Sequence, residues 1–341
     1  MWPFPDRAIK SETFPSNVTV DSGTCVVLDE LIEARHGIYA LGVGAQKGVH
    51  SLLAGGERSP FKGRGVDFEE VRRYQAGDDV RHMDWRVTAR SGMPHLKIFR
   101  EERERPVFVV VDYTSSMLFG TRVAFKSVIA ARTASLLAWA SQHRGDRVGA
   151  VVFSDHGHAI VRPRGGQSGV LQVLHALSRH HQQIDMHTPM NDGTGRSAFS
   201  TALERVKRTA RPGSLIFILS DFRALDDQAI PYVTQLSGHH DVVGVMVSDP
   251  LEQEPPSPGM YGVTNGTDFG VVNTWDAPFV ETYRRRFKER YQLVENLCVQ
   301  RGMGFFQIST HVPVEEAVRR GLRLIGDRHK HIRARRLNGD S

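Results

Sequence analysis

The sequence has few cysteines and no long hydrophobic run. Only Cys25 and Cys298 are cysteines among its 341 residues, and they lie far apart in the chain. Disulfide frameworks and zinc or redox motifs use closely spaced pairs, so these are not expected. No apolar stretch reaches the roughly 20 residues of a membrane-spanning helix. Residues 1–5 also lack the basic-then-apolar pattern of a signal peptide. We therefore expect a cytoplasmic protein without a membrane span.

The sequence also lacks a strong excess of charge of either sign. Its 44 Lys and Arg residues stand against 38 Asp and Glu residues, which gives a formal net charge of +6. This excess is too small and too dispersed to indicate nucleic-acid binding. The basic residues gather in 62–105 and 328–336. Each of these stretches is either solvated surface or a binding face for an acidic partner.

Common catalytic and nucleotide-binding motifs are missing as well. The chain contains neither the Gly-x-Ser-x-Gly elbow of α/β-hydrolases nor a phosphate-binding loop of the Gly-x-x-x-x-Gly-Lys-Ser/Thr type. Asp112 follows an apolar run, as the nucleophile of an aspartate-based phosphatase would. That chemistry needs a second acid two residues later, and Thr114 stands there. We therefore expect a protein that is not an enzyme.

What the sequence does contain is a regular alternation of apolar runs and helical segments. The apolar runs span 106–111, 147–153, 214–219, 241–247 and 304–308. Runs without polar alternation are typical of strands buried on both faces of a parallel sheet. The helical segments span 121–143, 168–181, 197–211, 226–236, 278–301 and 313–325. This alternation predicts an α/β fold, a doubly wound and mainly parallel sheet of the Rossmann type.

The alternation begins near residue 106 and suggests a division of the chain. Residues 1–105 are expected to form a β-rich N-terminal module packed against the main domain. Residues 106–327 would form the α/β domain. Within it, 250–275 carries Pro-Pro and Asn-Gly turn signals that predict an inserted hairpin. Residues 328–341 are expected to be a basic tail.

Two aspartates stand at the ends of predicted strands. Asp112 ends the first apolar run, and Asp221 follows the third. Ligands of doubly wound sheets bind beyond the carboxyl ends of the strands, where the strand order reverses. Thr114 and Ser116 add hydroxyl groups beside Asp112, and hard divalent cations prefer such oxygen ligands. If the two strands are neighbours, the residues predict a cation site; Asp112 alone could equally be a turn or cap residue.

The segment Asp112-Tyr113-Thr114-Ser115-Ser116 resembles the Asp-x-Ser-x-Ser signature of the metal-ion-dependent adhesion site of von Willebrand factor type A domains. Thr114 stands in the place of the usual first serine. The resemblance implies a von Willebrand factor A-like domain and a Mg²⁺ or Mn²⁺ site whose shell a partner's carboxylate completes. In that family a loop hydroxyl and a later aspartate add to the site; Ser197 occupies the expected place of the hydroxyl, although Thr194 is close enough to compete. The implied metal ligands are Asp112, Thr114, Ser116, Ser197 and Asp221.

A second group of motifs lies between residues 65 and 90. It consists of Gly65-Val66-Asp67-Phe68, Arg72-Arg73-Tyr74, Gly77-Asp78-Asp79-Val80-Arg81 and Asp84-Trp85-Arg86-Val87-Thr88-Ala89-Arg90. In this order the motifs resemble the hallmark of the bacterial proteins grouped as domain of unknown function 58. The match continues through the Asp112 loop, the Asp221 strand end and the segment near Tyr261. Such proteins commonly accompany MoxR-type ATPases of the AAA+ superfamily, and the resemblance implies an adaptor or chaperone-like role beside one.

The same segment mixes arginines, aspartates and one tryptophan. Such a mixture is either an ion-pair cluster that holds the N-terminal part in place or a surface that docks a partner, and the two roles are compatible. The candidate docking residues are Arg72, Arg73, Tyr74, Asp78, Asp79, Arg81, Asp84, Trp85, Arg86 and Arg90.

These observations lead to one expected function and two alternatives. The expected function is a non-catalytic, metal-dependent adaptor or chaperone-like factor that binds a MoxR-type ATPase and its client. The first alternative is a metal-dependent hydrolase in which the same ion activates water, which would need a separate acid or base in the crevice. The second is a scaffold whose metal site has decayed and whose contacts are made by residues 72–90.

Overall fold

A six-stranded sheet forms the centre of the computed structural model, which describes residues 23–41, 66–75, 78–101, 104–184, 197–264 and 269–338. Its strands are β3 (Pro106–Asp112), β4 (Arg147–Ser154), β5 (Gly157–Arg164), β6 (Leu215–Ser220), β7 (Asp241–Ser248) and β10 (Gly304–Ser309). The strand order is β10-β7-β6-β3-β4-β5. Neighbouring strands are parallel except β5, which pairs antiparallel with β4 at the edge. The predicted α/β fold with a mainly parallel sheet is confirmed.

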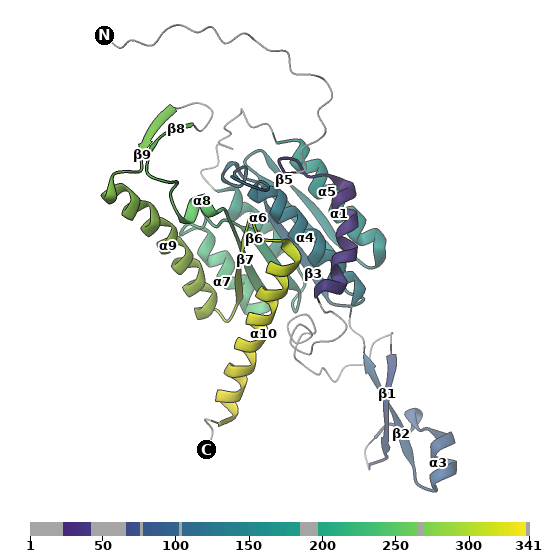
Figure 1. The fold of residues 1–341 in the computed structure, drawn as a ribbon. Helices are drawn as coiled ribbons and strands as arrows, with labels where there is room; N and C mark the ends of the chain where they lie inside the picture. Colours follow the sequence, from purple (N-terminus) through teal and green to yellow (C-terminus); the bar gives the residue numbers. More distant parts are fainter. Residues whose placement is uncertain are drawn as a thin grey trace, which may run out of the picture.

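Helices cover both faces of this sheet (Figure 1). One face carries α4 (Lys126–His143), α5 (Gly166–Gln182) and α10 (Val314–Asn338), and the other carries α6 (Ala198–Thr209), α7 (Ala229–His239) and α9 (Ala277–Gln300). The central strand β3 contributes side chains to the cores on both faces of the sheet. Val109 packs into the first core, under α4, α5 and α10, and Phe108 packs into the second core, under α6, α7 and α9. A strand that buries both of its faces needs an apolar residue at every position, which explains the unbroken apolar run.

The strand order fixes where a site can form. From β3 the chain moves outward through β4 to β5, and it then returns to the other side of β3 to build β6, β7 and β10. The connections therefore leave β3 and β6 in opposite directions, and in α/β sheets such a switch point is where a ligand-binding crevice forms, at the carboxyl ends of the strands. Asp112 and Asp221 lie at this place.

The first described residues belong to the main domain and correct the expected boundary at residue 105. Helix α1 (Leu28–Glu33) and the 3-10 helix Ala34–Leu41 contribute Leu31 and Ile38 to the first core. The carbonyl of Leu31 accepts hydrogen bonds from Ser135 and Trp139 of α4. The apolar side of α1 thus finds its partner in α4, a contact between residues more than 100 positions apart.

Residues 66–75 and 78–101 form a small mixed unit. Strands β1 (Val66–Arg73) and β2 (His95–Glu101) pair antiparallel, and the 3-10 helix Val80–His82 and helix α3 (Trp85–Ser91) connect them. The described residues before 105 therefore contain helices as well as strands, where the sequence predicted a β-rich module.

The C-terminal half contains two further features. After α8 (Pro250–Gln253), strands β8 (Met260–Thr264) and β9 (Phe269–Asn273) pair antiparallel before α9 begins. The basic stretch expected as a tail is helical up to Asn338, because α10 continues through it. Residues 328–338 contain no Gly or Pro and several good helix formers. None of the helices in the described ranges combines the length and the apolar character needed to cross a bilayer.

Candidate functional site

The two predicted aspartates lie at the same end of neighbouring strands. Strand β3 pairs parallel with β6, with Val111 opposite Leu219. Asp112 is the last residue of β3, and Asp221 follows the last residue of β6. Both side chains are buried, and their charges interact. The fold therefore brings together the two carboxylates that the sequence predicted at this crevice.

The loop after β3 gathers oxygen atoms around Asp112. One carboxylate oxygen accepts hydrogen bonds from the amide of Thr114 at 2.8 Å and from its hydroxyl at 2.7 Å. The other accepts the hydroxyl of Ser220 at 2.5 Å. The hydroxyl oxygens of Thr114 and Ser116 lie 3.4 Å apart. The alternate spacing of residues 112, 114 and 116 thus places a carboxylate and two hydroxyls in one small region.

Asp112 is held in an environment that disfavours its charge. Burial, followed by the nearby charge of Asp221, raises the pKa of Asp112 from 3.8 to about 7. The hydrogen bonds from Ser220 and Thr114 act in the opposite direction and do not compensate. A positive charge beside Asp112 would therefore stabilise the ionised carboxylate.

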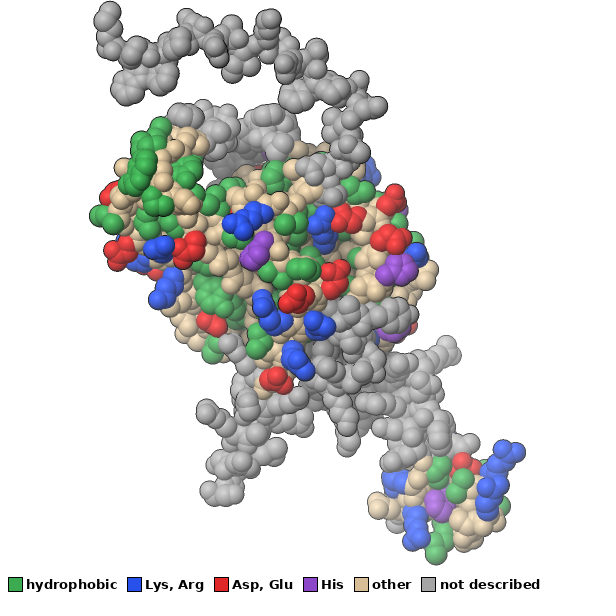
Figure 2. Space-filling view, in the orientation of Figure 1, with side chains coloured by type: hydrophobic (Ala, Val, Ile, Leu, Met, Phe, Trp, Pro, Cys, Tyr) green, Lys and Arg blue, Asp and Glu red, His purple; other side chains and the backbone are tan. Residues whose placement is uncertain are grey.

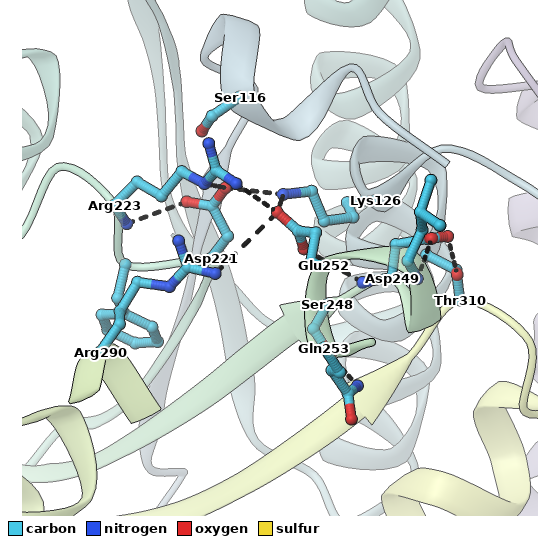
Figure 3. Close-up of polar contacts among 12 residues, drawn as sticks. Ser116, Lys126, Asp221, Arg223, Ser248, Asp249, Glu252, Gln253, Arg290 and Thr310 are labelled. Carbon is cyan, nitrogen blue, oxygen red and sulfur yellow. Dashed lines mark hydrogen bonds and ion pairs between the residues drawn. The ribbon is translucent and has the colours of Figure 1, made fainter. Parts of the chain in front are cut away.

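Asp221 is paired with a lysine that the sequence analysis did not identify. The ammonium group of Lys126 lies 2.7 Å from one carboxylate oxygen of Asp221 and 2.8 Å from Glu252, and it is fully buried (Figure 3). Burial alone would raise the pKa of Asp221, but the charge and hydrogen bond of Lys126 lower it overall. The second oxygen of Asp221 accepts the amide of Arg223. Asp221 also has a hydrogen bond with Ser116 and so can position that hydroxyl.

The ion pairs extend from the crevice to the helices beside it. Glu252 of α8 accepts a hydrogen bond from Arg223 at 2.9 Å, and the guanidinium of Arg290 from α9 lies 3.9 Å away (Figure 3). Glu252 is thereby shared among three cationic side chains that come from three parts of the chain. The network joins α4, the end of β6, α8 and α9 next to Asp112.

The remaining predicted ligands have different positions. Ser197 is the N-cap of α6, where its hydroxyl accepts from the amide of Ser200 and donates to the hydroxyl of that residue. Its hydrogen bonds within the described residues are with its own helix. Thr194 lies outside the described residues. A carboxylate that was not predicted, Asp155 after β4, accepts the amide of Ser115 at 2.7 Å and so fixes the Asp112 loop from the other side.

The donor atoms suit a hard divalent cation in one part of the crevice. Asp112, Thr114 and Ser116 offer a carboxylate and two hydroxyl oxygens, which are ligands that Mg²⁺ and Mn²⁺ accept. Within the described residues, no three His, Cys, Asp or Glu side chains are grouped to hold a metal ion. A cation here would therefore depend on hydroxyls. Asp221, held by Lys126, would act through Ser116 instead of binding the ion directly.

The candidate docking residues all lie in the unit of β1, α3 and β2. The carboxylate of Asp78 pairs with Arg72 at 2.7 Å, and the carboxylate of Asp84 caps α3. Trp85 is 70% exposed, and the side chains of Arg86 and Arg90 are exposed as well. Part of this group thus stabilises the unit itself and part faces solvent.

The fold and the crevice define an α/β protein with a buried carboxylate and hydroxyl cluster at the switch point of its sheet. The chain matches the model of the family described as "Protein of unknown function DUF58" over residues 70–295, which is more than half of its length. The chain belongs to this family.

Two mycobacterial proteins and two solved structures are similar to this chain. An uncharacterised protein of Mycobacterium bovis and one of Mycobacterium tuberculosis are each 30% identical over 225 residues, which cover 65% of this chain and 67% of theirs. Among solved structures, the conserved hypothetical protein BatB of Bacteroides thetaiotaomicron has a TM-score of 0.40 at 16% identity and covers 65% of this chain and 99% of BatB. The manganese-loaded TRAP protein of Plasmodium vivax has a TM-score of 0.30 at 16% identity over 42% and 57% of the two chains. These two structural likenesses are too weak to transfer a property to this chain.

Proposed function

We propose that this protein is a non-catalytic adaptor that binds a partner protein through a divalent cation held by Asp112, Thr114 and Ser116. The observation that carries the proposal is the state of Asp112, a buried carboxylate that is surrounded by hydroxyls and has its pKa raised to about 7. Asp221 already has Lys126 as its cationic partner, whereas the hydrogen-bond partners of Asp112 are neutral. A bound Mg²⁺ or Mn²⁺ supplies positive charge and an open coordination position that a partner's carboxylate can take.

The neighbouring carboxylates favour binding over hydrolysis. A metal-dependent hydrolase needs a group in the crevice that is free to accept a proton from water. Asp221 and Glu252 are both engaged by Lys126, and Asp155 accepts the amide of Ser115. These carboxylates serve the structure of the crevice, which supports a binding role for the chain.

The nature of the partner rests on the family. The resemblance to proteins that accompany MoxR-type ATPases supports such an ATPase, together with its client, as the partner in the cytoplasm. We expect the two proteins to co-purify in Mg²⁺ and to separate when EDTA removes the ion. Unchanged co-purification in EDTA would contradict a metal-dependent contact.

The cation site itself is tested by counting bound Mn²⁺ with electron paramagnetic resonance. The native protein should bind one Mn²⁺, and Asp112→Asn and Ser116→Ala should each weaken binding at least tenfold, about 1.4 kcal/mol. Asp227→Asn, which changes an exposed aspartate, is the matched control and should bind as the native protein does. The proposal is wrong if the native protein binds no Mn²⁺ at millimolar concentration, or if Asp112→Asn binds it equally well.

A further inference from the structure

The unit of β1, α3 and β2 has an uneven distribution of its charged side chains. Its acidic residues between positions 78 and 84 are engaged within the unit. Asp78 accepts the guanidinium of Arg72 and the amide of Gln75, and this arrangement lowers the pKa of Asp78. Asp79 and Asp84 each cap the helix that follows them by accepting backbone amides. These carboxylates therefore stabilise the local fold and leave the positive charges to face outward.

The exposed arginines of helix α3 lie on one side of the helix. Residues three and four apart on a helix are neighbours on its surface. Trp85 and Ala89 are therefore adjacent, as are Arg86 and Arg90, and all four side chains are exposed. The opposite side packs inward, where the hydroxyl of Thr88 accepts the amide of His95 at the start of β2. We call Trp85, Arg86, Ala89 and Arg90 the α3 face.

The two arginines of the α3 face have no ion-pair partner within the described residues. Lys and Arg side chains stand at the outer edges of this unit in Figure 2. A guanidinium group offers a planar set of donors that binds a carboxylate through two parallel hydrogen bonds. Trp85, at 70% exposure, adds a large apolar surface next to them. Tryptophan and arginine are the residue types most enriched at the centres of protein interfaces.

We propose that the α3 face docks an acidic segment of a partner protein. The segment would carry two carboxylates spaced to reach Arg86 and Arg90, and an apolar side chain that packs on Trp85. This inference is independent of the cation site, because it involves none of the residues around Asp112. It gives the chain a second contact surface whose binding needs no metal ion.

The charge balance of the unit favours a protein segment over a nucleic acid. Residues 66–75 and 78–101 contain seven Asp or Glu and seven Lys or Arg, so their formal charges cancel. Binding to a nucleic-acid backbone commonly neutralises several phosphates at once and relies on a broad positive field. Two arginines beside one tryptophan form a local site instead, of the size that a short acidic segment fills.

The test measures binding of a labelled synthetic helical peptide to the full chain by fluorescence anisotropy. The peptide carries Glu residues four positions apart and one Leu between them, and a second peptide has Gln in place of Glu. The double variant Arg86→Gln/Arg90→Gln should bind the Glu peptide at least tenfold more weakly, and Trp85→Ala at least threefold. Arg319→Gln/Arg323→Gln is the matched control, since it changes an exposed pair at the same spacing on α10.

Several results would overturn the proposal. One is equal binding of the Glu and Gln peptides, and another is unchanged binding by the Arg86/Arg90 variant. A third is a preference of the native protein for a single-stranded oligonucleotide or for phosphatidylserine vesicles that disappears in the same variant. Asp112→Asn and EDTA should leave peptide binding unchanged, so a failure of the cation site is distinguishable from a failure of the α3 face.

Discussion

Lys126 carries a buried positive charge between two buried carboxylates. Moving an ammonium group out of water is costly, and the cost is offset only when opposite charges lie within hydrogen-bond distance. Asp221 and Glu252 supply those charges at 2.7 and 2.8 Å. Removal of Lys126 takes away the one buried cation that contacts both carboxylates, and only the longer or more exposed contacts of Arg223 and Arg290 remain. The contacts of Lys126 therefore stabilise the buried carboxylates at this end of the sheet.

Replacement of this lysine tests that argument. Lys126→Met retains most of the length of the side chain but removes its charge, so we expect a loss of about 3–5 kcal/mol in the free energy of unfolding. Chemical denaturation measures it. Lys207→Met, at an exposed lysine on α6, is the control and should change stability by less than about 0.5 kcal/mol. Adding Glu252→Gln to Lys126→Met should restore part of the lost free energy of unfolding. If the losses of the two single variants simply add in the double variant, the two residues are not coupled.

At the scale of the elements, the contact of α10 with β10 depends on a glycine. A Cβ atom at Gly321 would lie 2.2 Å from the ring of Phe306, which is itself buried in the first core. A ring enclosed on its other sides cannot move away freely. The small residue therefore permits α10 to approach the edge strand of the sheet.

Gly321→Ala should accordingly destabilise the protein by about 1–3 kcal/mol through overpacking. Gly238→Ala on α7 is the matched control, because a Cβ atom there meets nothing within 4 Å. That substitution should be neutral or stabilise the protein by up to about 1 kcal/mol, as alanine favours helix more than glycine does. Thermal melts of the two variants measure this difference. Equal melting temperatures would show that α10 does not need its close approach to β10.

For the whole molecule, the sequence predicts the parts of the fold that depend on local pattern. Each parallel strand is buried on both faces and therefore appears as an unbroken apolar run, as in 106–111 and 214–219. The same runs end at Asp112 and Asp221, so the sequence also predicts the position of the site if the two strands are neighbours. The sequence does not predict the edge strand β5, because its exposed and partly buried residues alternate, with arginines among them.

Contacts between distant parts of the chain could not be predicted in the same way. Lys126 contacts Glu252, which lies 126 positions later in the chain, and no local sequence pattern predicts this pairing. The one signal is a lysine at the start of a helix whose next five residues, up to Ala131, are small or apolar. The packing of Leu31 against α4 could not be predicted for the same reason. Periodicity indicates which face of a helix is apolar but not which element covers that face.

The charge of Asp112 links the site to the stability of the whole domain. Its pKa in the folded protein, about 7, lies above its ordinary value of 3.8, so the folded state holds a proton that the unfolded chain releases between these values. The stabilising contribution is complete below pH 3.8 and is lost as the pH rises through 7. At pH 8 the ionised carboxylate therefore destabilises the fold unless a cation compensates it.

The most direct test compares the melting temperatures of the native protein and Asp112→Asn at pH 5 and pH 8, with and without about 10 mM Mg²⁺. The hydroxyl of Ser220 can turn to accept the new amide, so the variant should keep its hydrogen bonds. Without the ion at pH 8, the variant should melt about 5 °C higher, and this gap should shrink at pH 5. Mg²⁺ should raise the melting temperature of the native protein alone. The account is wrong if Asp112→Asn melts at a lower temperature than the native protein at pH 8 and Mg²⁺ changes neither melting temperature. Asp112 would then not be an uncompensated carboxylate that binds a cation.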